Sequence, residues 1–281
     1  MSTDTDIAAD ALQAIRAGEL RRALELLQEH VRRQPSDARL RTFLFQLLAV
    51  RGEWDRALRQ LGMAGELDPS AQPMVQTYEG AIRCEPLREQ VFAGKKVPLL
   101  LGEPEPWTAL LLEALLQEGQ GDSAAGAGLR ARALDEAPVS AGTANGEAFE
   151  WLADADTRIG PVLEAVMQGR YYWVPFTRIA RISLDPPVDL RDVVWMPAHL
   201  QFSNGGESVA LLPTRYAGTP LDQDAFALSR RTDWAEPEPG RFVGQGQRIL
   251  ATPSTEYPLM DLREVVFDLP AAGPDDEHAQ D

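Results

Sequence analysis

The residues of this sequence best suited to chemistry are Asp154, Asp156 and Arg158, each separated from the next by one residue. Two carboxylates at this spacing can bind a cation or carry out acid–base catalysis. The same pattern also forms Asx turns and ion pairs where two domains meet, because a short acidic side chain accepts hydrogen bonds from nearby backbone N–H groups. We favour this structural interpretation and keep the catalytic one as an alternative.

The other reactive side chains do not form a familiar catalytic or metal-binding motif. The three histidines, His30, His199 and His278, are far apart and have no Asp or Glu at metal-ligand spacing. The segment 244–246, Gly-Gln-Gly, lacks the third glycine and the strand-to-helix context of a phosphate-binding loop. We therefore expect a protein without catalytic activity, cofactor or metal.

A run of aromatic residues offers a different kind of site. Tyr171, Tyr172 and Trp173 are consecutive, and Phe176 and Trp195 follow within the next 22 residues. In a strand, Tyr171 and Trp173 would point to one face and Tyr172 to the other. We expect the pattern to belong mainly to the core, although exposed aromatic side chains would be good contact anchors for a partner protein.

Composition and charge restrict the class of protein. The 281 residues are 44% hydrophobic and 25% charged, which is typical of folded chains and long enough for two domains. The formal net charge of -16 argues against binding to nucleic acids or anionic membranes. The single cysteine, Cys84, cannot form an intramolecular disulfide, and we expect it to be buried.

No segment is expected to direct the chain to a membrane. Residues 1–10 are acidic and have no apolar core, unlike a secretory signal. The most apolar stretch, residues 99–116, is interrupted by Gly102, Glu103, Pro104, Glu105 and Pro106, so it is not a transmembrane helix. The expected location is the cytoplasm.

The first quarter of the chain repeats with a period of 34 residues. Gly18 and Gly52 begin corresponding segments that end at Pro35 and Pro69. This period is typical of tetratricopeptide-type helical hairpins, in which glycine permits the turn and proline ends the second helix. Leucine and alanine at helical spacing within residues 20–31 would form the buried stripe.

Helical patterns continue to about residue 138. Residues 73–92 predict a helix with a kink or break at Pro86, and residues 106–118 and 124–137 predict two more. We therefore predict a tetratricopeptide-like helical-repeat domain over residues 1–138. The small, polar residues 139–147 predict a linker.

Beyond the linker the pattern changes to short strands. Residues 162–167 and 171–176 flank a Gln-Gly-Arg turn, and strand-like segments follow at 178–184, 193–196, 198–202, 208–212, 247–251 and 265–269. We predict an α+β domain over residues 148–270 that is small, mainly β, strongly bent and barrel-like. Residues 271–281 predict a disordered acidic tail.

Three motifs in this region resemble the ImpE family, also called SciE or TagJ, of accessory proteins of bacterial type VI secretion systems. They are the segments 151–161, 169–176 and 186–192, with weaker support from 195–198, 246–248 and 264–267. The signature residues are Asp154, Asp156, Arg158, Gly160, Tyr171, Trp173, Pro175, Phe176, Asp189, Arg191, Asp192 and Trp195. Since the segment 154–160 follows the linker, we predict that it fixes the geometry between the two domains.

The resemblance implies a cytoplasmic, non-catalytic adaptor of the contractile sheath. Its expected partners are the small sheath subunit, bound through its N-terminal helix, and the AAA+ ATPase ClpV. The helical repeats would present a concave surface for the partner helix, with Arg21, Arg41, Phe45 and Trp54 as the predicted contacts. The arginines could equally belong to a solvated helix face. The alternatives are a tetratricopeptide scaffold or chaperone for another client, and a small-barrel enzyme that uses Asp154 and Asp156.

Overall fold

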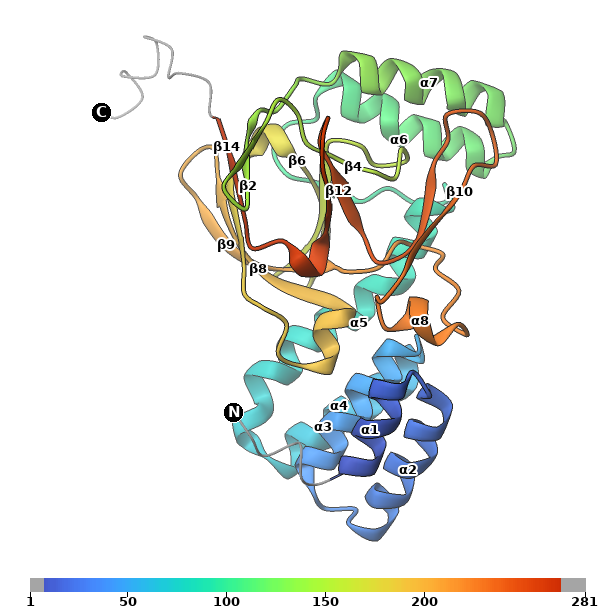
Figure 1. Ribbon diagram of the computed structural model, residues 1–281, viewed down its shortest axis with the longest axis vertical. Coiled ribbons are helices and arrows are strands. Elements are labelled where there is room, and N and C mark those ends of the chain that lie inside the picture. The colour runs from blue at the N-terminus through green and yellow to red at the C-terminus, as the bar shows by residue number, and fades with distance from the viewer. Residues whose placement is uncertain (1–7, 269–281) are drawn as a thin grey trace.

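The computed structural model describes residues 8–268 and shows an α+β protein with a helical region followed by a β-rich one. Four helices lie at one end of the molecule, helices α6 and α7 lie at the other, and the sheets lie between them (Figure 1). The predicted tail at 271–281 falls outside the described residues. No helix within residues 8–268 is both long and apolar enough to cross a bilayer.

The first four helices form two hairpins. They are α1 (Ala9–Ala17), α2 (Leu20–Arg33), α3 (Ala38–Val50) and α4 (Trp54–Leu67). The turns fall at Gly18 and Gly52, whose φ angles of 76° and 70° lie in the left-handed region that glycine adopts at little cost. The expected stripe of α2 is buried. Membership of the tetratricopeptide class stays a prediction.

Helix α5 (Gln72–Phe92) connects the hairpins to the sheet, after a short 3-10 turn η1 (Pro69–Ala71). Pro86 lies inside α5 but does not end it. Helices α6 (Pro106–Gly119) and α7 (Ser123–Glu136) form where their patterns predicted helices, and they pack as an antiparallel pair (Figure 1).

The main sheet has nine strands in the order β1-β6-β5-β9-β8-β7-β14-β2-β3. Their bounds are β1 (Leu99–Leu100), β2 (Gly142–Ala144), β3 (Glu147–Phe149), β5 (Val162–Met167), β6 (Arg170–Pro175), β7 (Ile179–Leu184), β8 (Trp195–Phe202), β9 (Glu207–Pro213) and β14 (Glu264–Phe267). All neighbouring pairs are antiparallel except β1 with β6.

One part of the strand prediction needs correction, and another is not confirmed. The segments 193–196 and 198–202 are not separate strands, because β8 continues through Pro197 and pairs with β9 on one side and β7 on the other. Within the described residues the sheet is open, with β1 and β3 at its edges, so the predicted barrel-like shape is not confirmed.

Smaller elements complete the β-rich region. A three-stranded sheet joins β13 (Glu256–Pro258), β12 (Ile249–Ala251) and β4 (Ala153–Asp154), and a two-stranded one joins β10 (Thr232–Ala235) and β11 (Val243–Gly246). A short helix α8 (Asp224–Ala227) and the 3-10 turns η2 (Phe176–Arg178), η3 (Leu190–Val193) and η4 (Leu259–Asp261) lie between strands.

The helices and the sheet share one core. One apolar cluster runs from Leu20 and Leu47 in the hairpins to Trp195 and Leu211 on the helix-facing side of the main sheet. A second cluster, including Leu163 and Met196, fills the opposite side. Part of the predicted linker 139–147 is β2 and the start of β3, and β1 of the helical region joins the sheet. The domain limits themselves stay a prediction.

Candidate functional site

A buried network of charged residues lies where α5 meets the sheet. Arg88 of α5 donates from its Nε to Oε1 of Glu164 on β5 over 2.6 Å. Arg248, just before β12, contacts both Glu164 and Asp154 of β4. The side chains of all four residues are at most 5% exposed. Two arginines therefore neutralise two carboxylates in the interior and connect the helical region to two sheets.

The network determines the ionisation of its carboxylates. Burial alone would raise the pKa of Glu164, but attraction by Arg88 and Arg248 and hydrogen bonds from Arg88 and Tyr171 lower the pKa to about 2. Burial raises the pKa of Asp154 to about 6, although its contact with Arg248 opposes the shift. Glu164 is thus the permanently charged centre of the network.

Acid should remove the contribution of Glu164 to stability. The pKa of Glu164 is about 2 in the folded protein and 4.5 in the unfolded chain. Its contribution to the unfolding free energy is therefore complete above about pH 5 and is lost as the pH falls toward 2. We expect the difference in unfolding free energy between the wild type and Glu164→Gln to shrink below pH 4 by about 1.4 kcal/mol per pH unit. Urea titrations from pH 5 to pH 3 would measure it, and a constant difference would contradict the assignment.

The aromatic run extends this network into the sheet. The hydroxyl of Tyr171 donates to Glu164, and Nε1 of Trp173 donates to the Tyr171 hydroxyl oxygen over 2.7 Å. Phe92 of α5 packs on Trp173 with ring centroids 5.8 Å apart. Tyr171 and Trp173 are therefore core residues on the helix-facing side, whereas Tyr172 on the other side is half-buried.

A second cluster joins the hairpins to the sheet. Trp195 at the start of β8 is fully buried, and its Nε1 donates to Oε1 of Glu85 over 2.7 Å. Its ring lies 5.8 Å from that of Trp54 and 5.9 Å from that of Tyr78. Phe45 packs on Tyr78 and is also fully buried. The face of the hairpins that carries Phe45 and Trp54, here called their inner face, therefore packs on α5 and on the β-rich region.

The ends of three hairpin helices are capped from the β-rich region. Arg215 donates to the backbone oxygen of Val50 over 2.6 Å, and Arg230 donates to that of Ile15 over 3.1 Å. Asp224 accepts from the backbone N–H of Leu20 over 2.9 Å. Cations at helix C-termini and an anion at an N-terminus complement the helix dipoles. Burial lowers the pKa of Arg215 to about 10, which leaves it charged at neutral pH.

The segment 154–160 is a tight loop held by its own acidic residues. Asp156 is fully buried and accepts from the Nε and backbone N–H of Arg158, each over 2.9 Å, and from the backbone N–H of Gly244 over 3.0 Å. The guanidinium of Arg158 lies 4.8 Å from the centre of the Phe92 ring on α5. A Cβ on Gly160 would approach Leu134 of α7 to 2.5 Å. The loop thus contacts α5, α7 and β11.

These contacts support the prediction that the segment fixes interdomain geometry. Replacing Asp156 with alanine removes the acceptor for four N–H donors, three from Arg158 and one from Gly244, and should lower the unfolding free energy by about 2 kcal/mol. We also expect faster limited proteolysis between residues 137 and 160, because the loop loses its anchor. Unchanged stability together with an unchanged digestion pattern would count against the prediction.

The remaining signature residues also have structural contacts. Asp189 and Asp192 form a capping box around η3, and the guanidinium of Arg191 stacks on Tyr78 at 4.5 Å. Pro175 ends β6, and Phe176 stacks on Phe267 with centroids 5.2 Å apart. The signature residues therefore lie partly at the contact between the helical and β-rich regions and partly in the second apolar cluster. They do not line a single cleft.

The arrangement of polar groups is structural in character. Oxygens of Asp154 and Asp156 already accept from Arg248, Arg158 and backbone N–H groups. Within residues 8–268 there is no cluster of three His, Cys, Asp or Glu side chains that could hold a metal ion. Burial raises the pKa of the Cys84 thiol to about 11, so it is protonated at neutral pH.

Sequence reasoning missed the centre of the network. It assigned no role to Arg88, Glu164, Arg215 or Arg248. One signal was present, since Glu164 is the single charged residue in an otherwise apolar strand, which indicates a buried pair.

The predicted partner contacts are divided between surface and core. Arg21 is exposed and pairs with Glu25 over 3.3 Å, and Arg41 donates to Gln60 over 2.8 Å. Phe45 is buried, and Trp54 is half-buried against Trp195. In this conformation Phe45 is not available to a partner, whereas the role of the other three residues stays a prediction.

Comparison with known proteins identifies the family. The family model for "ImpE protein" matches residues 146–266. The chain is 51% identical over 263 residues to the type VI secretion system accessory component TagJ of Pseudomonas aeruginosa, covering 93% of this chain and 92% of TagJ. The crystal structure of protein VPA1032 from Vibrio parahaemolyticus superposes with a TM-score of 0.85 at 26% identity, covering 94% of this chain and 99% of that one. The chain belongs to the ImpE family.

Proposed function

We propose that this protein is an accessory component of a type VI secretion system and acts in the cytoplasm as a non-catalytic adaptor. The observation that carries the proposal is its 51% identity to TagJ over 93% of the chain. Because the similarity covers both the helical and the β-rich regions, it applies to the whole described fold.

Two partners are expected. The first is the small subunit of the contractile sheath, bound through its N-terminal helix, and the second is the ATPase ClpV. The N-terminal hairpins are suited to protein recognition because they carry an excess of arginine in an otherwise acidic protein. Residues 8–60 contain ten arginines against seven acidic residues, whereas the whole chain has a net charge of -16. This uneven distribution of charge along the chain would orient the protein as it meets a partner that carries both positive and negative patches.

A scaffold for another client remains the rival function, because two helical hairpins with a 34-residue period are common to such scaffolds. The enzymatic alternative needs Asp154 and Asp156 to be free for a substrate or cation. Both carboxylates instead accept hydrogen bonds inside the protein, which supports the adaptor proposal.

Calorimetric titration with a peptide of the sheath subunit's N-terminal helix tests the proposal. We expect the full-length protein to bind with a dissociation constant of about 1 μM or tighter. The full chain is required because Arg88 and Glu164 tie the helical region to the sheet, so a fragment of residues 1–140 would leave buried charges unpaired. Equal binding of a scrambled peptide, or no binding of the native one, would contradict the proposal.

A further inference from the structure

The helix-facing side of the main sheet is only partly covered. Trp195, Pro197 and His199 alternate along β8 and therefore lie on the same face. Trp195 is buried under α5 and the hairpins, but His199 is exposed. On the neighbouring strand β9, Leu211 is 5% exposed and Val209 is 68% exposed. An apolar face thus continues outward from beneath the helices into solvent.

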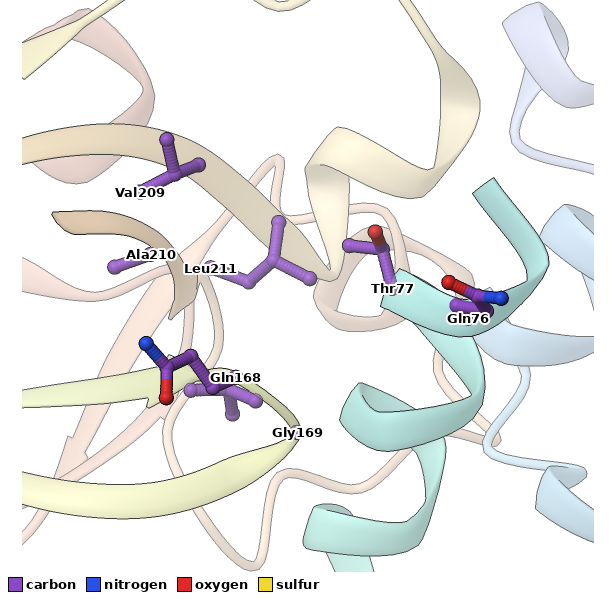
Figure 2. A pocket seen from close by; sticks show the side chains of 8 residues that line it. Gln76, Thr77, Gln168, Gly169, Val209, Ala210 and Leu211 are labelled. Carbon is purple, nitrogen blue, oxygen red and sulfur yellow. The ribbon is translucent and has the colours of Figure 1, made fainter. Parts of the chain in front are cut away.

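A continuous groove follows this uncovered face. A pocket of about 400 Å³ lies between Val209 and Leu211 of β9, Thr77 of α5 and the Gln168–Gly169 turn. Figure 2 shows Val209 and Leu211 on the same side of their strand, with Thr77 and Gln76 on the opposite wall. A second pocket of about 300 Å³ shares Val209 and continues over β8 and β7.

The strand register shows that the two pockets form one surface. Val209 pairs with His199, and His199 pairs with Ser183 on β7. Residues directly opposite each other in antiparallel strands project to the same face. The groove therefore crosses β9, β8 and β7 in one row, beginning at the wall formed by α5.

The dimensions fit one helix. Neighbouring strands are about 4.8 Å apart, and a helix with its side chains is about 10 Å across, so a helix covers roughly two strands. Helix α5 already packs on this side of the sheet. Its Gly80 lies so close to the turn that a Cβ atom added to Gly80 would be only 2.6 Å from the Cα of Gly169. A second helix over β9 and β8 would lie beside α5 and continue the interface that α5 makes.

The lining specifies the chemistry of that helix. The first pocket contains no charged side chain, although a quarter of the residues in this chain are charged. Acidic residues lie around the two pockets, with Glu207 two residues before Val209 on β9 and Asp185 lining the second pocket. The nearby Arg181 of β7 is already paired with Glu264. An uncharged centre between acidic borders complements an apolar helix stripe with basic residues beside it.

We propose that the groove over β9 and β8, between α5 and Asp185, is the docking site for an amphipathic helix of a partner protein. The occupant has an apolar stripe and flanking lysine or arginine residues. The inference rests on the proposed function, in which the partner binds through a helix. It places the binding site on the open face of the sheet and not on the inner face of the hairpins.

Titration of the full-length protein with the sheath subunit's N-terminal helix peptide tests the site. Val209→Glu places a charge in the centre of the groove at an exposed position, and Thr77→Arg fills the opposite wall. Each should weaken binding at least tenfold. Val139→Glu is the matched control, because Val139 is 74% exposed and lies outside both pockets. Its binding should equal that of the wild type, and thermal unfolding should show that all three variants are folded.

The outcomes separate this inference from the proposed function. Wild-type binding that persists in Val209→Glu and Thr77→Arg would overturn the groove while leaving the adaptor function intact. Loss of binding in Arg21→Glu with retention in Val209→Glu would overturn it in favour of the helical hairpins. Absence of binding by the wild type would overturn both.

Discussion

Replacing Glu164 with glutamine is expected to lower the free energy of unfolding by about 3 to 5 kcal/mol. The substitution keeps the shape of the side chain but removes the charge that Arg88 and Arg248 share. It leaves the two buried guanidinium groups with weaker pairing, because Arg248 keeps only Asp154 and Arg88 keeps only its 3.6 Å contact with Glu85. Urea denaturation followed by circular dichroism would measure the loss.

The matched control is Glu264→Gln, the same substitution in an exposed pair. Glu264 accepts from Arg181 over 2.7 Å, but both side chains are nearly half exposed, at 45% and 48%. Water and salt screen such a pair, so its removal should cost less than about 1 kcal/mol. Similar losses in the two variants would show that the buried network does not stabilise the fold as its geometry indicates.

The network joins the helical region to two sheets of the β-rich region. Arg88 comes from α5, Glu164 from the main sheet, and Arg248 and Asp154 from the small three-stranded sheet. A change in the position of α5 relative to the sheet would separate charges that have no access to water. Because replacing a whole buried ion pair with apolar residues is often neutral, we expect this network to favour one position of α5 on the sheet more than it adds net stability.

The helices were predictable from sequence because their signals are local. Glycine at 18 and 52, proline near the helix ends and apolar spacing within each helix all act within a few residues. The β5–β6 hairpin was predictable for the same reason. Its turn residues Gln168 and Gly169 have φ angles of 50° and 72°, as a two-residue hairpin turn requires.

Strands β2 and β3 were missed although a local signal was present. Asn145 and Gly146 adopt φ angles of 50° and 85° in a tight hairpin, and Asn-Gly is a strong sequence signal for that turn. The flanking residues are small and polar, which favoured the linker interpretation. Strand β2 is held by pairing with β14, about 120 residues later in the chain, and β3 in turn pairs with β2. The pairing of β2 with β14 has no local signature.

The candidate site was predictable only in part for a related reason. The acidic pair Asp154 and Asp156 was visible as a motif, and the structure shows that both residues are buried and paired. Their environment depends on Arg248, 94 residues away, and Arg88 reaches Glu164 over 76 residues. Sequence spacing alone does not say which arginine meets which carboxylate.

Replacing Trp195 with alanine is expected to lower the unfolding free energy by about 3 to 5 kcal/mol. Trp195 fills the junction of the hairpins, α5 and β8, where it packs against Trp54 and Tyr78. The truncation also leaves the buried Glu85 without its donor. Urea denaturation followed by far-UV circular dichroism would measure the loss without depending on tryptophan fluorescence.

Two comparison variants identify the cause of that loss. Trp195→Phe keeps most of the aromatic volume and removes only the N–H donor to Glu85, so it should cost about 1 to 3 kcal/mol. Trp151→Ala makes the same truncation at a side chain that is 40% exposed and should cost about 1 kcal/mol or less. Equal losses in Trp195→Ala and Trp151→Ala would contradict a central role for Trp195. A loss in Trp195→Phe as large as that in Trp195→Ala would mean that the hydrogen bond to Glu85, more than packing, holds the hairpins on the sheet.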